Sequence, residues 1–219
     1  MNRLLSLLPG CLLFSACGDG ANTNSTLGGD PNAVANERDA KLPTRSGPFG
    51  IAAGMPLSEL SSEGEREEAT GLSLLSSAPD ANSEFPEIAV ISFPETGVCE
   101  VRALSKVFDS DSYIVSASSF ADQTAAALDT RYGKSRKNEG CSGYSCDSPY
   151  KLMHIKDGSY WYGYEWRSKG SGSLPSQVKA IDLYILNAQF NDSQVRLDYR
   201  FNNEEACERA LKTAKAGNL

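Results

Sequence analysis

The chain contains one histidine, His154, and nucleophilic catalysis by a serine or cysteine usually needs such a base beside it. The neighbours Leu152, Met153 and Ile155 predict a strand position next to the core, where a hydrogen-bonded structural histidine is favoured over a catalytic one. No Gly-x-Ser-x-Gly elbow, His-Glu-x-x-His pair or Walker phosphate loop occurs in the sequence. We therefore expect a non-enzymatic protein, although a glycosidase-type carboxylate pair brought together across strands would leave no motif.

Two acidic residues in the segment Asp109-Ser110-Asp111 have the spacing of calcium ligands. The Gly and the distal Glu of an EF-hand loop do not follow them, so we predict an ordinary turn. A zinc site would show a repeated short spacing of Cys or His, and the chain has no such repetition. We expect neither a metal nor another cofactor.

The residues best suited to binding lie in the aromatic segment between Tyr160 and Arg167. In a strand, the four aromatic residues at alternate positions from Tyr160 to Trp166 share one face, and Trp161 and Arg167 share the other beside Gly163. Aromatic rings next to charges suit sugar rings or protein hot spots, whereas the alternative is that these rings pack under helices. The candidate binding surface comprises Trp161, Trp166 and Arg167, with Tyr144 from a nearby polar loop.

Four cysteines follow the N-terminal region, and in an oxidising compartment they would form two disulfides. The six-residue loop from Cys141 to Cys146 contains Gly143 and can close on itself, which leaves Cys99 to pair with Cys207. We favour this connectivity over the two others. The bridge between Cys99 and Cys207 closes the longer loop, so we expect it to contribute more stability, about 4–5 kcal/mol.

The N-terminal segment has Arg3, an apolar run to Phe14, and then Ser15-Ala16-Cys17. It resembles the signal peptide and lipobox of bacterial lipoproteins, except that Phe14 stands where Leu is usual. The resemblance implies cleavage after residue 16, a diacylglycerol thioether and a further acyl chain such as palmitate on Cys17, and sorting to the outer membrane facing the periplasm. Asp19 would favour the inner membrane in some bacteria, and an ordinary cleaved signal peptide is the alternative.

The following residues, 17–46, are rich in small and polar types and predict a disordered tether after the lipidated cysteine. Residues 47–219 suffice for one α+β domain, which could consist of two αβββ units. The formal net charge of −7 disfavours nucleic acid and anionic headgroups as partners.

The hydrophobic patterns predict an antiparallel α+β fold in the order helix-βββ-helix-βββ-helix, with two three-stranded meanders and packed helices. The expected helices begin at Pro56, span 120–132 with Phe120, Thr124, Ala127, Leu128 and Tyr132 as the buried stripe, and span 204–215. The expected strands cover 71–77, 86–93, 98–108, 159–167, 178–186 and 194–201. In the strand 98–108, Cys99 is expected on the same inner face as Val101 and Ala103.

The segment from Gly54 to Leu60, which opens with Gly-Met, is similar to the helix opening of outer-membrane assembly lipoproteins of the BamE/SmpA kind, and Tyr132-Gly133-Lys134 adds to the likeness. The helix-plus-meander order also resembles that of the β-lactamase-inhibitor protein. These resemblances imply a fold, and they assign no functional residue.

The sequence therefore predicts a lipid-anchored, disulfide-stabilised envelope protein that faces the periplasm and binds another envelope protein through its sheet or its 141–146 loop. One alternative is an inhibitor or immunity-like protein directed against an exported hydrolase. The other is a glycan-binding or peptidoglycan-binding lipoprotein, which would need Trp161 or Trp166 to be exposed.

Overall fold

The structure is a computed structural model that describes residues 47–67, 69–168 and 174–217. The expected signal peptide, the lipidation residue Cys17 and the tether lie outside these residues. Within them, no helix has the length and apolar character needed to cross a bilayer.

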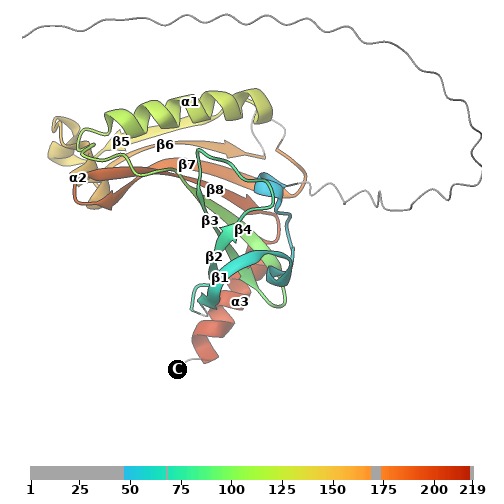
Figure 1. Cartoon of the computed structure of the whole chain (residues 1–219). Coiled ribbons are helices and arrows are strands. Elements are labelled where there is room, and N and C mark those ends of the chain that lie inside the picture. The colour runs from blue at the N-terminus through green and yellow to red at the C-terminus, as the bar shows by residue number, and fades with distance from the viewer. Residues whose placement is uncertain (1–46, 68, 169–173, 218–219) are drawn as a thin grey trace, which may run out of the picture. The chain divides into compact units, whose positions relative to one another are not determined.

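One eight-stranded antiparallel sheet forms the body of the protein, in the order β1-β2-β3-β4-β8-β7-β6-β5 (Figure 1). Each half of the sheet is a four-stranded meander, and the pairing of β4 with β8 joins the halves. The strands are β1 (Ser61–Glu67), β2 (Leu72–Ser77), β3 (Glu87–Phe93), β4 (Gly97–Leu104), β5 (Arg136–Cys141), β6 (Tyr160–Arg167), β7 (Val178–Gln189) and β8 (Asp192–Phe201).

Three α-helices accompany the sheet: α1 (Val115–Tyr132), α2 (Lys151–Lys156) and α3 (Glu204–Gly217). Helix α1 packs on β6, β7 and β8, α2 contacts β6 and β7, and α3 contacts β3 and β4. Short 3₁₀ helices occur at η1 (Pro48–Gly50), η2 (Leu57–Glu59) and η3 (Gly143–Cys146).

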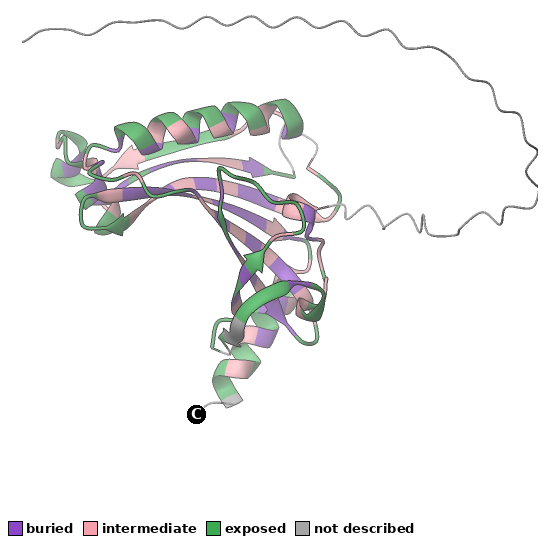
Figure 2. Ribbon diagram, in the orientation of Figure 1, coloured by how far each residue is buried: buried purple, intermediate pink, exposed green. Residues whose placement is uncertain are grey.

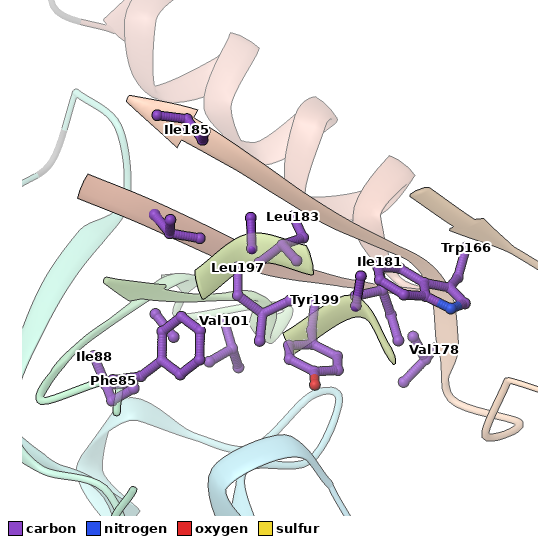
Figure 3. Close-up of a cluster of buried hydrophobic side chains, with 14 of the residues drawn as sticks. Phe85, Ile88, Val101, Trp166, Val178, Ile181, Leu183, Ile185, Leu197 and Tyr199 are labelled. Atoms are coloured by element: carbon purple, nitrogen blue, oxygen red, sulfur yellow. The ribbon is translucent and has the colours of Figure 1, made fainter. Parts of the chain in front are cut away.

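The main core lies between α1 and the sheet face that it covers. In the inner strands, Val101, Ile181, Leu183 and Leu197 alternate with charged residues, so their side chains meet on one face (Figure 3). Figure 2 shows the resulting alternation of buried and less buried residues along the strands. The opposite face is therefore free to carry polar groups.

The α+β class and the antiparallel sheet are confirmed, but the order helix-βββ-helix-βββ-helix is wrong. The Glu-rich segment 61–67 forms the edge strand β1, and β5 precedes η3 and α2 within the expected polar excursion. Only a 3₁₀ turn follows Pro56. Edge strands need little apolar periodicity, which explains why the pattern missed both of them.

Helix α1 begins five residues earlier than expected and buries Tyr132 as expected, but the rest of its buried stripe is Ala117, Ala121 and Ala125. Ala127 is exposed, and Phe120 and Leu128 lie partly buried at the side of the stripe. The small alanine side chains let the helix approach the large aromatic residues of β6.

A bulge reverses the expected side of Cys99. Ile91 pairs with Glu100 and Ser92 with Val98, so Cys99 is an extra residue in β4. It leaves the face of Val101 and packs with Phe93, Cys207 and Ala210 in a second, smaller core under α3. The expectation that Cys99 shares the inner face of Val101 and Ala103 is therefore wrong.

Two disulfides link the cysteines of the described residues. Cys99 pairs with Cys207 at a Cα–Cα distance of 6.4 Å, and Cys141 pairs with Cys146 at 5.2 Å. The first bridge ties α3 to β4, and the second closes the loop between β5 and α2. This is the connectivity favoured by the loop argument.

Candidate functional site

The sheet face opposite α1 carries the candidate site, and we call it the open face. Helix α1 packs on the other side of β6, β7 and β8, and among the described helices α2 reaches this face through Ile155 at one end. A hollow of about 600 Å³ lies on it, lined by residues of β4 to β8 and by Ile155 and Gly158 at one end. Five strands thus contribute side chains to one broad, shallow surface.

Strand register places a row of three carboxylates across the floor of the hollow. Asp198 pairs with Asp182 across β8 and β7, and Asp182 pairs with Glu165 across β7 and β6. The row ends in Arg102 on β4 and Arg136 on β5, which are register partners of Asp198 and Glu165. Like charges directly opposite each other destabilise a sheet, so the row requires compensation.

Arginines from neighbouring rows supply this compensation. Arg167 Nη2 lies 2.6 Å from Glu165 Oε2 and 2.6 Å from Asp182 Oδ1, and Arg200 Nη2 lies 2.6 Å from Asp182 Oδ2. Arg196 Nε donates to Asp198 Oδ1 at 2.7 Å. The result is a continuous ladder of alternating charges across the face.

The ladder extends to Glu100 on β4, whose Oε1 accepts from Arg102 Nε at 2.5 Å and lies 3.5 Å from Arg196 Nη2. Burial raises the pKa of the Glu100 carboxyl, against the opposing effect of Arg102. Burial and the Asp198 carboxylate raise the pKa of Tyr184, whose hydroxyl donates to Asp198 Oδ2 at 2.9 Å. Each carboxylate of the ladder therefore has a cationic partner.

Trp161 stands at the β5 side of the hollow, with 43% of its surface exposed. Its register partner is Gly140, where an added Cβ would lie 2.4 Å from the indole, so the ring rests on bare backbone. At Gly163 an added Cβ would lie 2.3 Å from the carbonyl oxygen of Leu183, so glycine permits the close approach of β6 and β7 beside the indole. The two glycines thus form a flat floor around an exposed aromatic ring.

The structure places the other candidate residues on different surfaces. Arg167 lies on the open face with Trp161, as the alternation predicts. Trp166 is 2% exposed beneath α1, where its Nε1 donates to Asp129 Oδ1 at 3.1 Å and to the carbonyl of Gly133 at 3.0 Å. Trp166 is therefore a structural residue, and the interpretation of it as part of a binding surface is wrong.

Tyr144 is 74% exposed on η3, inside the loop closed by Cys141 and Cys146, and it does not line the hollow. Its ring meets His154 edge-on with centroids 5.1 Å apart. His154 is buried in α2 rather than in a strand, because a short apolar run does not distinguish the two. Its Nδ1 pairs with Ser159 Oγ at 3.1 Å, whereas Nε2 has no partner among the described residues.

The segment Asp109-Ser110-Asp111 precedes α1 and caps the first turn of this helix. The buried Asp111 carboxylate accepts from the backbone of Ser116 and Ala117 at the first turn and from Ser193 Oγ at 2.6 Å. The part of the chain that the structure describes contains no cluster of three His, Cys, Asp or Glu residues arranged to hold a metal ion.

The part of the site that comes from β4, β7 and β8 was not predicted from the sequence. A signal existed in the alternation of Arg196, Asp198 and Arg200 with apolar residues, which indicates a wet face. What the sequence lacks is the register that aligns these residues with Asp182 and Glu165.

Comparison with known proteins adds no assignment to this geometry. No protein-family model, no curated protein and no solved structure matches the chain.

Proposed function

We propose that this protein is a lipid-anchored protein of the bacterial envelope that faces the periplasm and binds another envelope protein, without catalysing a reaction, through the open face of its sheet. The observation that carries the proposal is the hollow, which combines an exposed tryptophan, a tyrosine and five nearby arginines on a rigid sheet. Tryptophan, tyrosine and arginine are the residues that dominate binding energy in protein interfaces.

The rigidity of the surface supports this role. The hollow lies on regular strands whose side chains are fixed by ion pairs, so a partner would order few groups on binding. Helix α2 borders the hollow through Ile155, and the first disulfide anchors α3 to β4. The lipid anchor proposed at Cys17 would hold the domain at the membrane where such a partner is found.

Site-directed photocrosslinking tests the proposal in the native envelope. A photoreactive benzoylphenylalanine replaces Asn138, an exposed residue that lines the hollow, or replaces Ala127, an exposed residue of α1. We expect one discrete protein adduct from position 138 and none of that mass from position 127. Identical adducts from both positions, or no adduct from position 138, would contradict binding through the open face.

A second candidate, an inhibitor or immunity-like protein against an exported hydrolase, is favoured by the exposure of Tyr144 on a disulfide-closed loop. Such a loop is suited to insertion into a partner's cleft. Under this hypothesis Tyr144→Ala abolishes the complex, while Tyr150→Ala, at a residue that is 51% exposed outside the disulfide loop, leaves it intact. A complex insensitive to both substitutions would remove the candidate.

A further inference from the structure

On the open face, the arginine side chains are more exposed to solvent than the carboxylates with which they form ion pairs. Side-chain exposure is 77% for Arg136, 41% for Arg167 and 29% for Arg102, whereas their partner carboxylates Glu165, Asp182 and Glu100 are 11%, 22% and 15% exposed. The same order holds for Arg196 at 21% over Asp198 at 9%, and for Arg200 at 32% over Asp182. In every pair, the guanidinium is the more exposed group.

An approaching molecule therefore meets guanidinium groups first. The ladder contains five arginines and four carboxylates, and Glu204 beside Arg200 and Glu87 at the β3 edge add two further carboxylates, so it is the exposure of the guanidinium groups rather than an excess of positive charge that sets the chemistry of the surface. Each arginine has five donor N–H groups in a planar fork, and the one or two carboxylates that each contacts do not occupy all of them. The unused donors suit bidentate contact with further carboxylates.

Apolar groups flank the ladder on both sides. Trp161 lies toward β5, and toward β2 a second hollow of about 300 Å³ is lined by Leu72, Leu74, Leu104 and Leu186, with Glu87 at its edge. The second hollow shares Arg102, Leu186 and Arg196 with the first, so the two are adjacent. Five strand-to-strand steps separate β2 from β6, a span of about 24 Å, which matches a short peptide segment rather than one sugar ring.

We infer that the open face receives a carboxylate-rich segment of a partner protein, with apolar side chains on either side of its acidic centre. This inference rests on the proposed function and specifies the chemistry of the partner. The partner's carboxylates contact the exposed guanidinium groups of the ladder. Its apolar side chains pack on Trp161 at one end and in the leucine-lined hollow at the other.

A random 12-residue peptide library displayed on phage and selected on the purified full chain tests the inference. We expect selected peptides to be enriched in Asp and Glu between aromatic or aliphatic residues. Synthetic copies should bind more weakly as salt rises, because screening weakens contacts between exposed charges. The double variant Arg102→Glu/Arg136→Glu should weaken their binding by about tenfold or more.

The matched control Arg131→Glu/Arg209→Glu makes the same change in net charge at exposed residues of α1 and α3. It should leave peptide affinity within about twofold, and the thermal midpoint of each variant verifies folding. Neutral or basic peptides that crosslink at position 138 would overturn the acidic partner and leave the proposed function standing. Failure to select any peptide that contacts the open face, together with no adduct at position 138, would overturn both.

Discussion

At the scale of single residues, the two tryptophans of β6 have different roles, one in the core and one on the proposed binding surface. They stand five positions apart, and an odd spacing places them on opposite faces of the strand. Trp166 fills the core beneath α1 and donates two hydrogen bonds, whereas Trp161 lies on the open face above Gly140. Their roles in stability and binding should therefore separate cleanly.

Trp166→Phe should lower the free energy of unfolding by about 1–3 kcal/mol, because the carbonyl of Gly133 and the Asp129 carboxylate both lose a donor. Trp161→Phe should change it by less than about 0.5 kcal/mol, since the residue is exposed. Urea unfolding followed by circular dichroism measures both values. Equal losses in the two variants would contradict the division.

The aromatic alternation of β6 was readable from the sequence, and so was the existence of one wet and one dry face. Which of the two tryptophans lies toward the core was not predictable, because Trp161 and Trp166 are equally apolar. The decision comes from α1, whose Asp122 and Asp129 accept hydrogen bonds from Tyr162, Tyr164 and Trp166. That pairing joins residues about 40 positions apart, beyond the reach of any local pattern.

At the scale of elements, Asp111 determines where α1 begins. Its carboxylate accepts hydrogen bonds from the backbone of Ser116 and Ala117 in the first turn and joins the helix to Ser193 at the start of β8. Asp111→Ala should lower the free energy of unfolding by about 2–4 kcal/mol, since it removes both a cap and a buried acceptor.

Asp109→Ala provides the matched control, because the residue lies two positions away and is exposed. Its effect should remain within about 0.5 kcal/mol. Chemical denaturation of the two variants with and without calcium makes the comparison. A stabilising effect of calcium that Asp111→Ala removes would show that the segment binds a cation after all.

The two disulfides should contribute unequally. The bridge between Cys99 and Cys207 spans 108 residues and should stabilise the fold by about 4–5 kcal/mol, against about 2 kcal/mol for the bridge between Cys141 and Cys146, which spans 5. Double Cys→Ser variants of each pair, compared by urea denaturation, measure the difference. Equal losses would indicate that the unfolded chain does not govern the effect.

Six of the eight strands and the two longer helices were predictable, since each has a period of 2 or a helical stripe. The strands β1 and β5 were not, because edge strands such as Ser61–Glu67 carry charges on positions that an inner strand would fill with apolar residues. The side of Cys99 was missed for a different reason. A one-residue bulge moves Cys99 away from the face of Val101, and no local sequence signal marks it.

At the scale of the whole molecule, five tyrosines couple stability to alkaline pH. Burial, followed by neighbouring carboxylates, raises the pKa of Tyr160, Tyr162, Tyr164 and Tyr184, and burial with Tyr132 raises that of Tyr199. Above the ordinary tyrosine pKa of about 10, the folded chain therefore holds more protons than the unfolded chain. Stability is fully present below that pH and falls as pH rises through the elevated values.

Thermal unfolding at pH values between about 7 and 11.5 tests this coupling. The midpoint should decline above about pH 10, and the absorbance of tyrosinate should rise together with loss of structure. Ionisation of all tyrosines in a chain that stays folded would contradict it.

The pairing of β4 with β8 also orders the folding of the chain in time. Residues 61–104 complete one meander early, yet the inner edge of that meander is covered only by residues 192–201, close to the end of the chain. Contacts so distant in sequence form slowly, and the unpaired strand β4 is prone to aggregation until β8 pairs with it. A protein built in this way joins the two halves of its sheet only after residues 192–201 are available to pair with β4.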